Sequence, residues 1–153
     1  MFIPCYTGTM EDGSSSINEE LVGTALQPYR HNVQIASKFG VTLENRRLIL
    51  NSGPEQIEIE QEQILRRLKT NYIDLYYQHR IDPKVEPEAV AEVMAKLAKE
   101  GKILHWGISE NSEEYLRRAH KVFPVTCIQN RYSCFSETMK IYLECWRSFL
   151  SVL

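Results

Sequence analysis

The sequence has 153 residues, 43% of them hydrophobic and 25% charged, and a formal net charge of −2 at pH 7. These values are typical of one globular domain and give no overall attraction to nucleic acid or anionic lipid. No apolar run approaches about 18 residues and no signal peptide is recognisable, so we expect neither a membrane span nor secretion.

The cysteine pattern indicates a reducing compartment. The four cysteines lie far apart, without a C-x-x-C pair. We therefore expect free thiols, a cytoplasmic location and no metal site.

From about residue 16 onward, helix and strand signals alternate along the chain. Capping boxes at residues 16–19 and 52–55 predict the starts of two helices, and Gly101 ends a third. In chain order we expect helices over about 19–27, 53–69, 87–100, 112–121 and 136–150, with strands over 33–38, 72–79, 103–109 and 125–129. Helical crossovers of this length require parallel pairing, so the fold class is α/β.

Polar residues stand where four of these strands end. They are Lys38, His79, Ser109 and Gln129. Parallel α/β folds place their chemistry at the carboxyl ends of strands, because loops there carry polar groups over a rigid floor. We therefore expect these four residues to share one rim of the sheet.

Two α/β architectures fit such a pattern. An open doubly wound sheet usually carries a glycine-rich phosphate loop after its first strand, and neither G-x-G-x-x-G nor G-x-x-x-x-G-K-[ST] occurs. A (β/α)₈ barrel places site residues on several strand tips, but it needs roughly 250 residues. The sequence thus favours a partial TIM barrel of about four to five βα units.

Five blocks of the sequence, in order, resemble the aldo-keto reductases. They are Asn18 to Leu26, Ala36 to Gly40, Leu65 to His79, Glu100 to Ile103 and Gly107 to Glu110. The resemblance covers about residues 18–135 of a single partial domain spanning 1–153. Residues 1–17 and the expected helix over 136–153 diverge from the family, so we expect a domain truncated at both ends.

The resemblance implies an NADP-dependent oxidoreductase that reduces a small aldehyde or ketone by hydride transfer. By position, Lys38 and His79 match the family's catalytic lysine and histidine, and Tyr6 is the candidate proton donor. Ser109 and Gln129 match residues that hold the nicotinamide carboxamide, with Glu110 standing where many members have Asn. The family's catalytic aspartate has no counterpart.

The chemistry of these residue types agrees with the implied reaction. A tyrosine is a weak acid at neutral pH, and a neighbouring lysine cation lowers its pKa. A neutral histidine can donate a hydrogen bond to a carbonyl oxygen. Taken alone, a strand-end lysine is more often a solvated charge, and a strand-end histidine often binds only a loop carbonyl.

The alternative from another class is a non-catalytic barrel remnant or interaction module without cofactor turnover. Association through open sheet edges is a further expectation, because a partial barrel exposes strands that can pair with another chain. Asp74 lies in mid-strand, where we expect a buried, hydrogen-bonded structural carboxylate.

Overall fold

The computed structural model describes residues 7–9, 15–44 and 47–130. Its centre is a four-stranded parallel sheet in the order β3-β6-β7-β8. The strands are β3 (Ala36–Phe39), β6 (Ile73–Gln78), β7 (Ile103–Ser109) and β8 (Cys127–Gln129). The predicted α/β class is confirmed, and so is the parallel pairing of the predicted strands.

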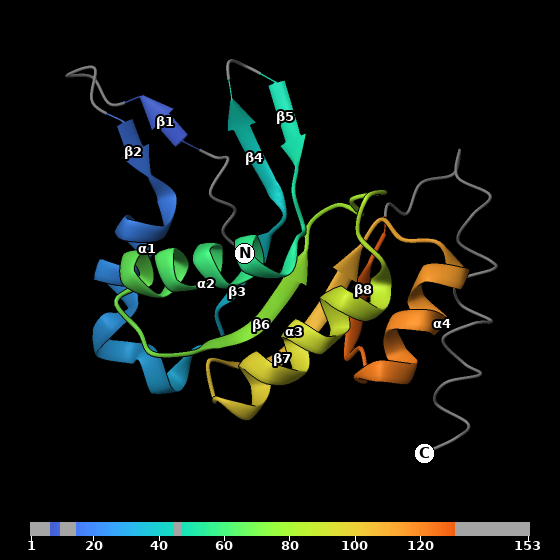
Figure 1. Ribbon diagram of the computed structural model, residues 1–153. Helices are drawn as coiled ribbons and strands as arrows, with labels where there is room; N and C mark the ends of the chain where they lie inside the picture. The colour runs from blue at the N-terminus through green and yellow to red at the C-terminus, as the bar shows by residue number, and fades with distance from the viewer. Residues whose placement is uncertain (1–6, 10–14, 45–46, 131–153) are drawn as a thin grey trace.

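Helices connect successive strands of this sheet (Figure 1). The connecting helices are α2 (Pro54–Leu68), α3 (Pro87–Lys99) and α4 (Glu113–Val122), whereas α1 (Asn18–Leu26) and the 3₁₀ helix η1 (Gln27–Asn32) precede β3. None of the helices in these described ranges is long and apolar enough to cross a membrane. The helix expected over residues 136–150 lies outside the described residues.

The core lies between one face of the sheet and helices α2, α3 and α4. Phe39 and Tyr76 stand on neighbouring strands with their ring centroids 4.7 Å apart, and both are fully buried. The apolar sides of the helices cover them, as the helical spacing predicts. The helix residues of this core include Ile57, Ile64, Leu68, Val90, Met94, Leu97, Leu116 and Ala119.

Two short hairpins project beyond the sheet on the same side of the molecule (Figure 1). One pairs β1 (Thr7–Thr9) with β2 (Ser15–Ile17), and the other pairs β4 (Val41–Glu44) with β5 (Arg47–Leu50). Residues 41–50 lie between the strand expected over 33–38 and the helix expected over 53–69, where no element was predicted. The register Val41↔Leu50 and Thr42↔Ile49 shows instead that residues 41–44 pair antiparallel with residues 47–50.

The capping box expected at residues 52–55 does not form, and the Ser16 side chain of the other expected box lies outside the described residues. Helix α2 is preceded by Gly53, which makes no side-chain cap, and Ser52 uses its hydroxyl elsewhere. Pro54 takes the first helical position, which its fixed φ favours, so the N-cap position falls on Gly53 instead of Ser52. Ser112 does cap α4, where its hydroxyl accepts a hydrogen bond of 3.2 Å from the Tyr115 N–H.

A buried carboxylate joins α1, α2 and β3. The Glu19 side chain is fully buried and accepts hydrogen bonds from Arg67 Nε at 2.6 Å and from Ser37 Oγ at 2.7 Å. Beside it, Gly23 lets the backbones of α1 and α2 approach closely. A Cβ at Gly23 would lie 2.6 Å from the carbonyl oxygen of Arg67.

We expect Gly23→Ala to destabilise the protein. The added methyl meets backbone atoms that cannot rotate away, and overpacking of about 3 kcal/mol exceeds the gain of about 1 kcal/mol in helix propensity. The net loss of about 2 kcal/mol is measurable by urea unfolding. Leu21→Ala on the exposed side of the same helix is the control, expected to change stability by less than about 0.5 kcal/mol. Equal stability of wild type and Gly23→Ala would contradict the close helix contact.

Candidate functional site

The register of the sheet brings the predicted strand-tip residues to one edge. Lys38 pairs with Tyr77, and Ser109 pairs with Gln129 on the neighbouring strand. His79 follows β6 directly and continues the ladder, because its N–H donates to the Phe39 carbonyl at 3.0 Å. All four strands are parallel, so these four positions share the carboxyl end of the sheet.

These side chains also share a face of the sheet. Successive side chains of a strand point to opposite faces. Phe39, Tyr76 and Gln78 face the helices, so Lys38, Tyr77 and His79 face the other way. On β7 and β8 the same face carries Gly107, Ser109, Cys127 and Gln129, which the register places opposite one another.

Lys38 is a buried charged residue. Only 5% of the residue is exposed, and its Nζ lies 5.9 Å from the centroid of the Tyr77 ring. The Tyr77 ring lies on Gly107, where an added Cβ would be 2.6 Å from Tyr77 Cε1. The Cys127 thiol in turn donates a hydrogen bond of 2.9 Å to the Tyr77 hydroxyl. An ammonium group and an aromatic ring therefore meet on this face of the sheet.

His79 is held in its neutral form at physiological pH. Burial lowers its pKa from 6.5 to about 4, and the positive charges of Lys38 and Arg80 act in the same direction. Its Nδ1 is buried and has no hydrogen-bond partner among the described residues. A neutral imidazole can donate from one ring nitrogen and accept at the other. That is the protonation state needed to bind a carbonyl oxygen without delivering a full charge.

The ends of β7 and β8 offer a hydroxyl beside an amide. Ser109 is 4% exposed, whereas Gln129 directly across from it is exposed. Glu110 follows with a left-handed backbone, φ 54°, and its N–H donates to the Gln129 carbonyl at 3.0 Å. Its carboxylate is 3.8 Å from Arg80 Nη1 near the surface. Asn adopts this backbone more readily than Glu.

The candidate proton donor, Tyr6, lies outside the described residues. Two tyrosines on β6 are described, and neither is suited to donate a proton. Burial raises the pKa of Tyr76 well above its usual value, with the carboxylates of Glu60 and Glu19 adding to the effect. Burial also raises the pKa of Tyr77, and its hydroxyl is already bonded to Cys127.

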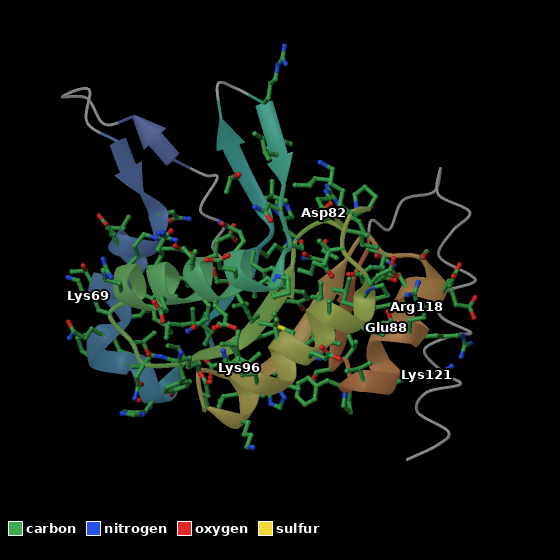
Figure 2. All side chains as sticks on the ribbon, viewed as in Figure 1. Lys69, Asp82, Glu88, Lys96, Arg118 and Lys121 are labelled. Atoms are coloured by element: carbon green, nitrogen blue, oxygen red, sulfur yellow. The ribbon has the colours of Figure 1, made fainter. Side chains whose placement is uncertain are left out.

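A buried chain of hydrogen bonds lies directly behind the rim, and sequence analysis missed it. Tyr115 Oη on α4 donates to Gln78 Oε1 at 3.0 Å, and Gln78 Nε2 donates to Ser52 Oγ at 3.4 Å. The Ser52 N–H donates to Asp82 at 3.3 Å. Figure 2 shows Asp82 in the connection between β6 and α3, beside the base of β5. The chain thus links α4 to the connections that follow β3 and β6.

The same region holds the turn after β3 in place. Gly40 has φ +85°, and its N–H donates to Glu60 Oε2 at 2.9 Å. Its carbonyl accepts from the Asn51 N–H at 3.2 Å, which closes the base of the β4–β5 hairpin. A Cβ at Gly40 would lie 2.5 Å from Ser52 Oγ. The backbone two residues after Lys38 is therefore held by hydrogen bonds on both sides, in a conformation and a space that suit glycine.

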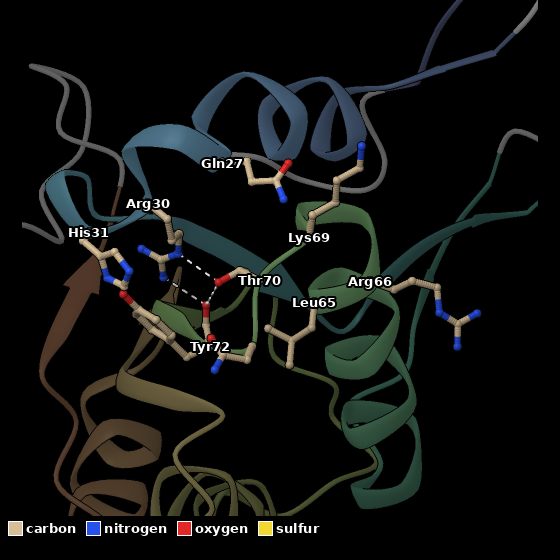
Figure 3. A pocket seen from close by; sticks show the side chains of 9 residues that line it. Gln27, Arg30, His31, Leu65, Arg66, Lys69, Thr70 and Tyr72 are labelled. Carbon is tan, nitrogen blue, oxygen red and sulfur yellow. Dashed lines mark hydrogen bonds between the residues drawn. The ribbon is translucent and has the colours of Figure 1, made fainter.

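A separate cavity of about 450 Å³ is lined by the end of α2 and by η1 (Figure 3). Its wall includes Arg30, whose guanidinium donates to Thr70 Oγ1 and to the carbonyls of Val33 and Tyr72. The guanidinium also pairs with Asp74 at 2.7 Å, and Asp74 accepts from the Ile35 N–H. The hydrogen bonding expected for Asp74 is confirmed, although its side chain is 14% exposed and not fully buried. The cavity borders the beginning of β6, whereas the candidate site lies at its end.

Comparison with protein families gives one match that spans most of the chain. The model of the aldo/keto reductase family matches residues 6–145. A probable aldo-keto reductase 1 from Glycine max is 38% identical over 137 residues, which cover 88% of this chain and 40% of that protein. The aldo-keto reductase str7 of Strobilurus tenacellus is 41% identical over 120 residues, covering 77% of this chain and 34% of that protein.

Solved structures give the same result. The glycerol dehydrogenase AKR11B4 from Gluconobacter oxydans matches with a TM-score of 0.75 and 32% identity, over 82% of this chain and 40% of that chain. An aldo/keto reductase from Klebsiella pneumoniae, in complex with NADP and acetate, matches with a TM-score of 0.66 and 30% identity. That match covers 84% of this chain and 43% of the other. The chain spans 40% and 34% of the length of these two curated relatives.

We expect the His79 imidazole to titrate near pH 4 in the folded protein. Its pKa is depressed, so the unfolded state binds more protons between about pH 6.5 and 4. Its contribution to stability is therefore complete above about pH 6.5 and is lost as the pH falls toward 4. Proton NMR of the histidine ring signals measures the pKa, with His79→Gln identifying the resonance. A His79 pKa near 6.5 would contradict the burial and the nearby lysine charge.

We expect Tyr115→Phe to weaken the support behind the rim. Removing the hydroxyl leaves buried Gln78 Oε1 without its donor, which costs about 1–3 kcal/mol. Chemical denaturation measures the loss. Tyr29→Phe, at a residue that is 60% exposed, is the matched control and should have no measurable effect. If both variants unfold like wild type, the Tyr115 hydroxyl does not contribute the predicted free energy to stability.

Proposed function

The chain belongs to the aldo/keto reductase family, and we propose that it carries the NADP-dependent carbonyl-reducing site of that family. The reaction would convert a small aldehyde or ketone into an alcohol. One observation supports this most strongly. A buried lysine and a neutral histidine stand on neighbouring strand ends, on the sheet face that also carries Ser109 and Gln129.

The residues of β7 and β8 suit a nicotinamide. A carboxamide has one carbonyl acceptor and an NH₂ donor group. The Ser109 hydroxyl and the Gln129 amide together offer a donor for the carbonyl and an acceptor for the NH₂ group. Glu110, with its carboxylate near Arg80, is the less suitable member of the proposed cofactor set. The Klebsiella pneumoniae relative was solved with NADP, which supports the choice of cofactor.

When bound, the nicotinamide supplies the hydride that reduces the carbonyl carbon. The chain's own residues serve the oxygen, on which negative charge develops. His79 in its neutral form donates a hydrogen bond to that oxygen and orients it. We assign Tyr6 as the proton donor, with the Lys38 ammonium lowering its pKa so that the proton can transfer near neutral pH.

The burial of Lys38 gives this electrostatic role its strength. A cation acts over a longer range where water is excluded, because the local dielectric constant is lower. Lys38 already depresses the pKa of His79 by this effect. The same field would stabilise a tyrosinate or an alkoxide placed on the rim, which is the charge distribution of carbonyl reduction.

The test is reduction of an aromatic aldehyde by NADPH, with the full chain as catalyst. Lys38→Met and His79→Gln should each lower turnover by about 100-fold or more, because general acid catalysis contributes at least that much. The controls are Lys69→Met and His31→Gln, exposed residues at the other end of the fold, which should retain wild-type turnover.

Two results would contradict the proposal. Turnover that survives Lys38→Met would show that the chemistry lies elsewhere. A folded chain that neither binds NADPH in a fluorescence titration nor reduces the aldehyde would support the non-catalytic alternative.

A further inference from the structure

The ammonium of Lys38 needs an interaction that fixes its position on the sheet face. Lysine has four rotatable bonds and loses about 2 kcal/mol of side-chain entropy when held in one conformation. Catalytic positioning tolerates little movement, since a displacement of about 1 Å can cost about 100-fold in rate. The groups that surround Lys38 Nζ therefore matter as much as the lysine itself.

The Tyr77 ring is one such group, and the structure holds it rigidly. Its edge lies against Gly107, where an added Cβ would be 2.6 Å from Tyr77 Cε1 and 2.8 Å from the Cys127 carbonyl oxygen. Its hydroxyl accepts a hydrogen bond from the Cys127 thiol at 2.9 Å. The ring thus packs directly against the backbone of Gly107, and the Cys127 thiol holds its hydroxyl.

The face of this ring is directed toward the lysine. Lys38 Nζ lies 5.9 Å from the ring centroid, within the distance at which a cation is attracted by the π system. The attraction is stronger for groups removed from water, and both residues are buried. The register Lys38↔Tyr77 makes the contact a consequence of the parallel pairing of β3 with β6.

We propose that Tyr77 is a positioning residue for Lys38: its ring, locked between Gly107 and Cys127, holds the Lys38 ammonium beside His79 at the rim. Tyr77 does not donate a proton in this arrangement. Its hydroxyl is directed to Cys127, and burial raises its pKa further from the neutral range. The inference extends the proposed function, but its test does not depend on catalysis.

His79 provides the readout, because its pKa reports the nearby positive charges. Lys38 and Arg80 both lower the pKa of His79, in addition to burial. Arg80 is more than a third exposed and lies 3.8 Å from Glu110, so it forms a separate pair near the surface. If the Tyr77 ring holds Lys38 in place, loss of the ring lets the ammonium move away, and the pKa of His79 rises.

The experiment is a double-mutant cycle on the full chain, with the His79 pKa measured by NMR. Tyr77→Leu should raise the pKa of His79 toward 6.5. Tyr77→Phe, which keeps the ring and its contact with Gly107 but loses the bond to Cys127, should raise it much less. In a Lys38→Met background, Tyr77→Leu should produce at most a third of that rise, because the charge is already gone.

Three outcomes would overturn the proposal. The first is an unchanged His79 pKa in Tyr77→Leu. The second is an equal rise with and without Lys38, which would show that the ring only shields the imidazole from water. The third is a rise in Tyr77→Phe as large as in Tyr77→Leu, which would assign the effect to the hydroxyl.

A measurement on the unaltered chain covers the case in which the ring-less variants do not fold. A lysine held over an aromatic ring has ε-methylene protons shifted upfield by the ring current. We expect that shift for Lys38 and expect it to disappear at pH values where the chain unfolds. Random-coil chemical shifts for the Lys38 ε-protons in the folded protein would overturn the proposal by themselves.

Discussion

Parallel pairing of β3, β6, β7 and β8 is the constraint from which the rest of the molecule follows. A parallel strand cannot be reached by a tight turn, so each connection must travel back along the sheet. The connections use α2, α3 and α4, whose apolar sides then cover one face and form the core. The same pairing aligns the carboxyl ends of the four strands, and this alignment brings Lys38, His79, Ser109 and Gln129 together there. This is the arrangement of the aldo/keto reductase barrel, of which the described residues form four parallel strands.

The rim is supported by polar groups rather than by apolar packing alone. Gln78 uses both ends of its amide, accepting from Tyr115 and donating to Ser52. Glu60 accepts from the Gly40 N–H and from Gln56, although burial raises its pKa. Buried polar groups are costly unless they are satisfied, so such a set tolerates few arrangements. Because few arrangements satisfy these polar groups, they fix the backbone next to Lys38 and His79.

Much of the fold could be read from the sequence, because its signals are local and repeated. The apolar spacing of α3 and the β-branched and aromatic run of β6 each specify their element with little help from the rest of the chain. The rim positions followed from the strand ends, and their shared edge followed from the topology. Their side-chain roles remain predictions.

Other features depend on contacts that sequence spacing does not reveal. The β4–β5 hairpin has no strong turn signal, and its pairing was not predicted. Ser52 resembles a helix cap, but it bonds to Gln78, which is 26 residues away in the sequence. The partner of Tyr77 is Cys127, separated by 50 residues. These long-range pairs cannot be read from a single sequence, since each residue type is common in its local sequence context.

The position of β3 at the edge of the described sheet order has a consequence for biosynthesis. Its neighbour in that sheet is β6, which is translated more than thirty residues later, and its preceding loop is fixed by Asp74 through the Ile35 N–H. The hydrogen-bond donor of Glu19, Arg67, is likewise translated 48 residues later. On the ribosome, Glu19 and β3 therefore emerge before the elements that bind them in the folded protein. Glu19 reaches Arg67 only after α2 has left the exit tunnel, and β3 pairs with β6 only after β6 has left it. Residues 18–78 form the smallest stretch in which these early elements can dock, so nascent-chain folding should begin as a step of that length rather than strand by strand.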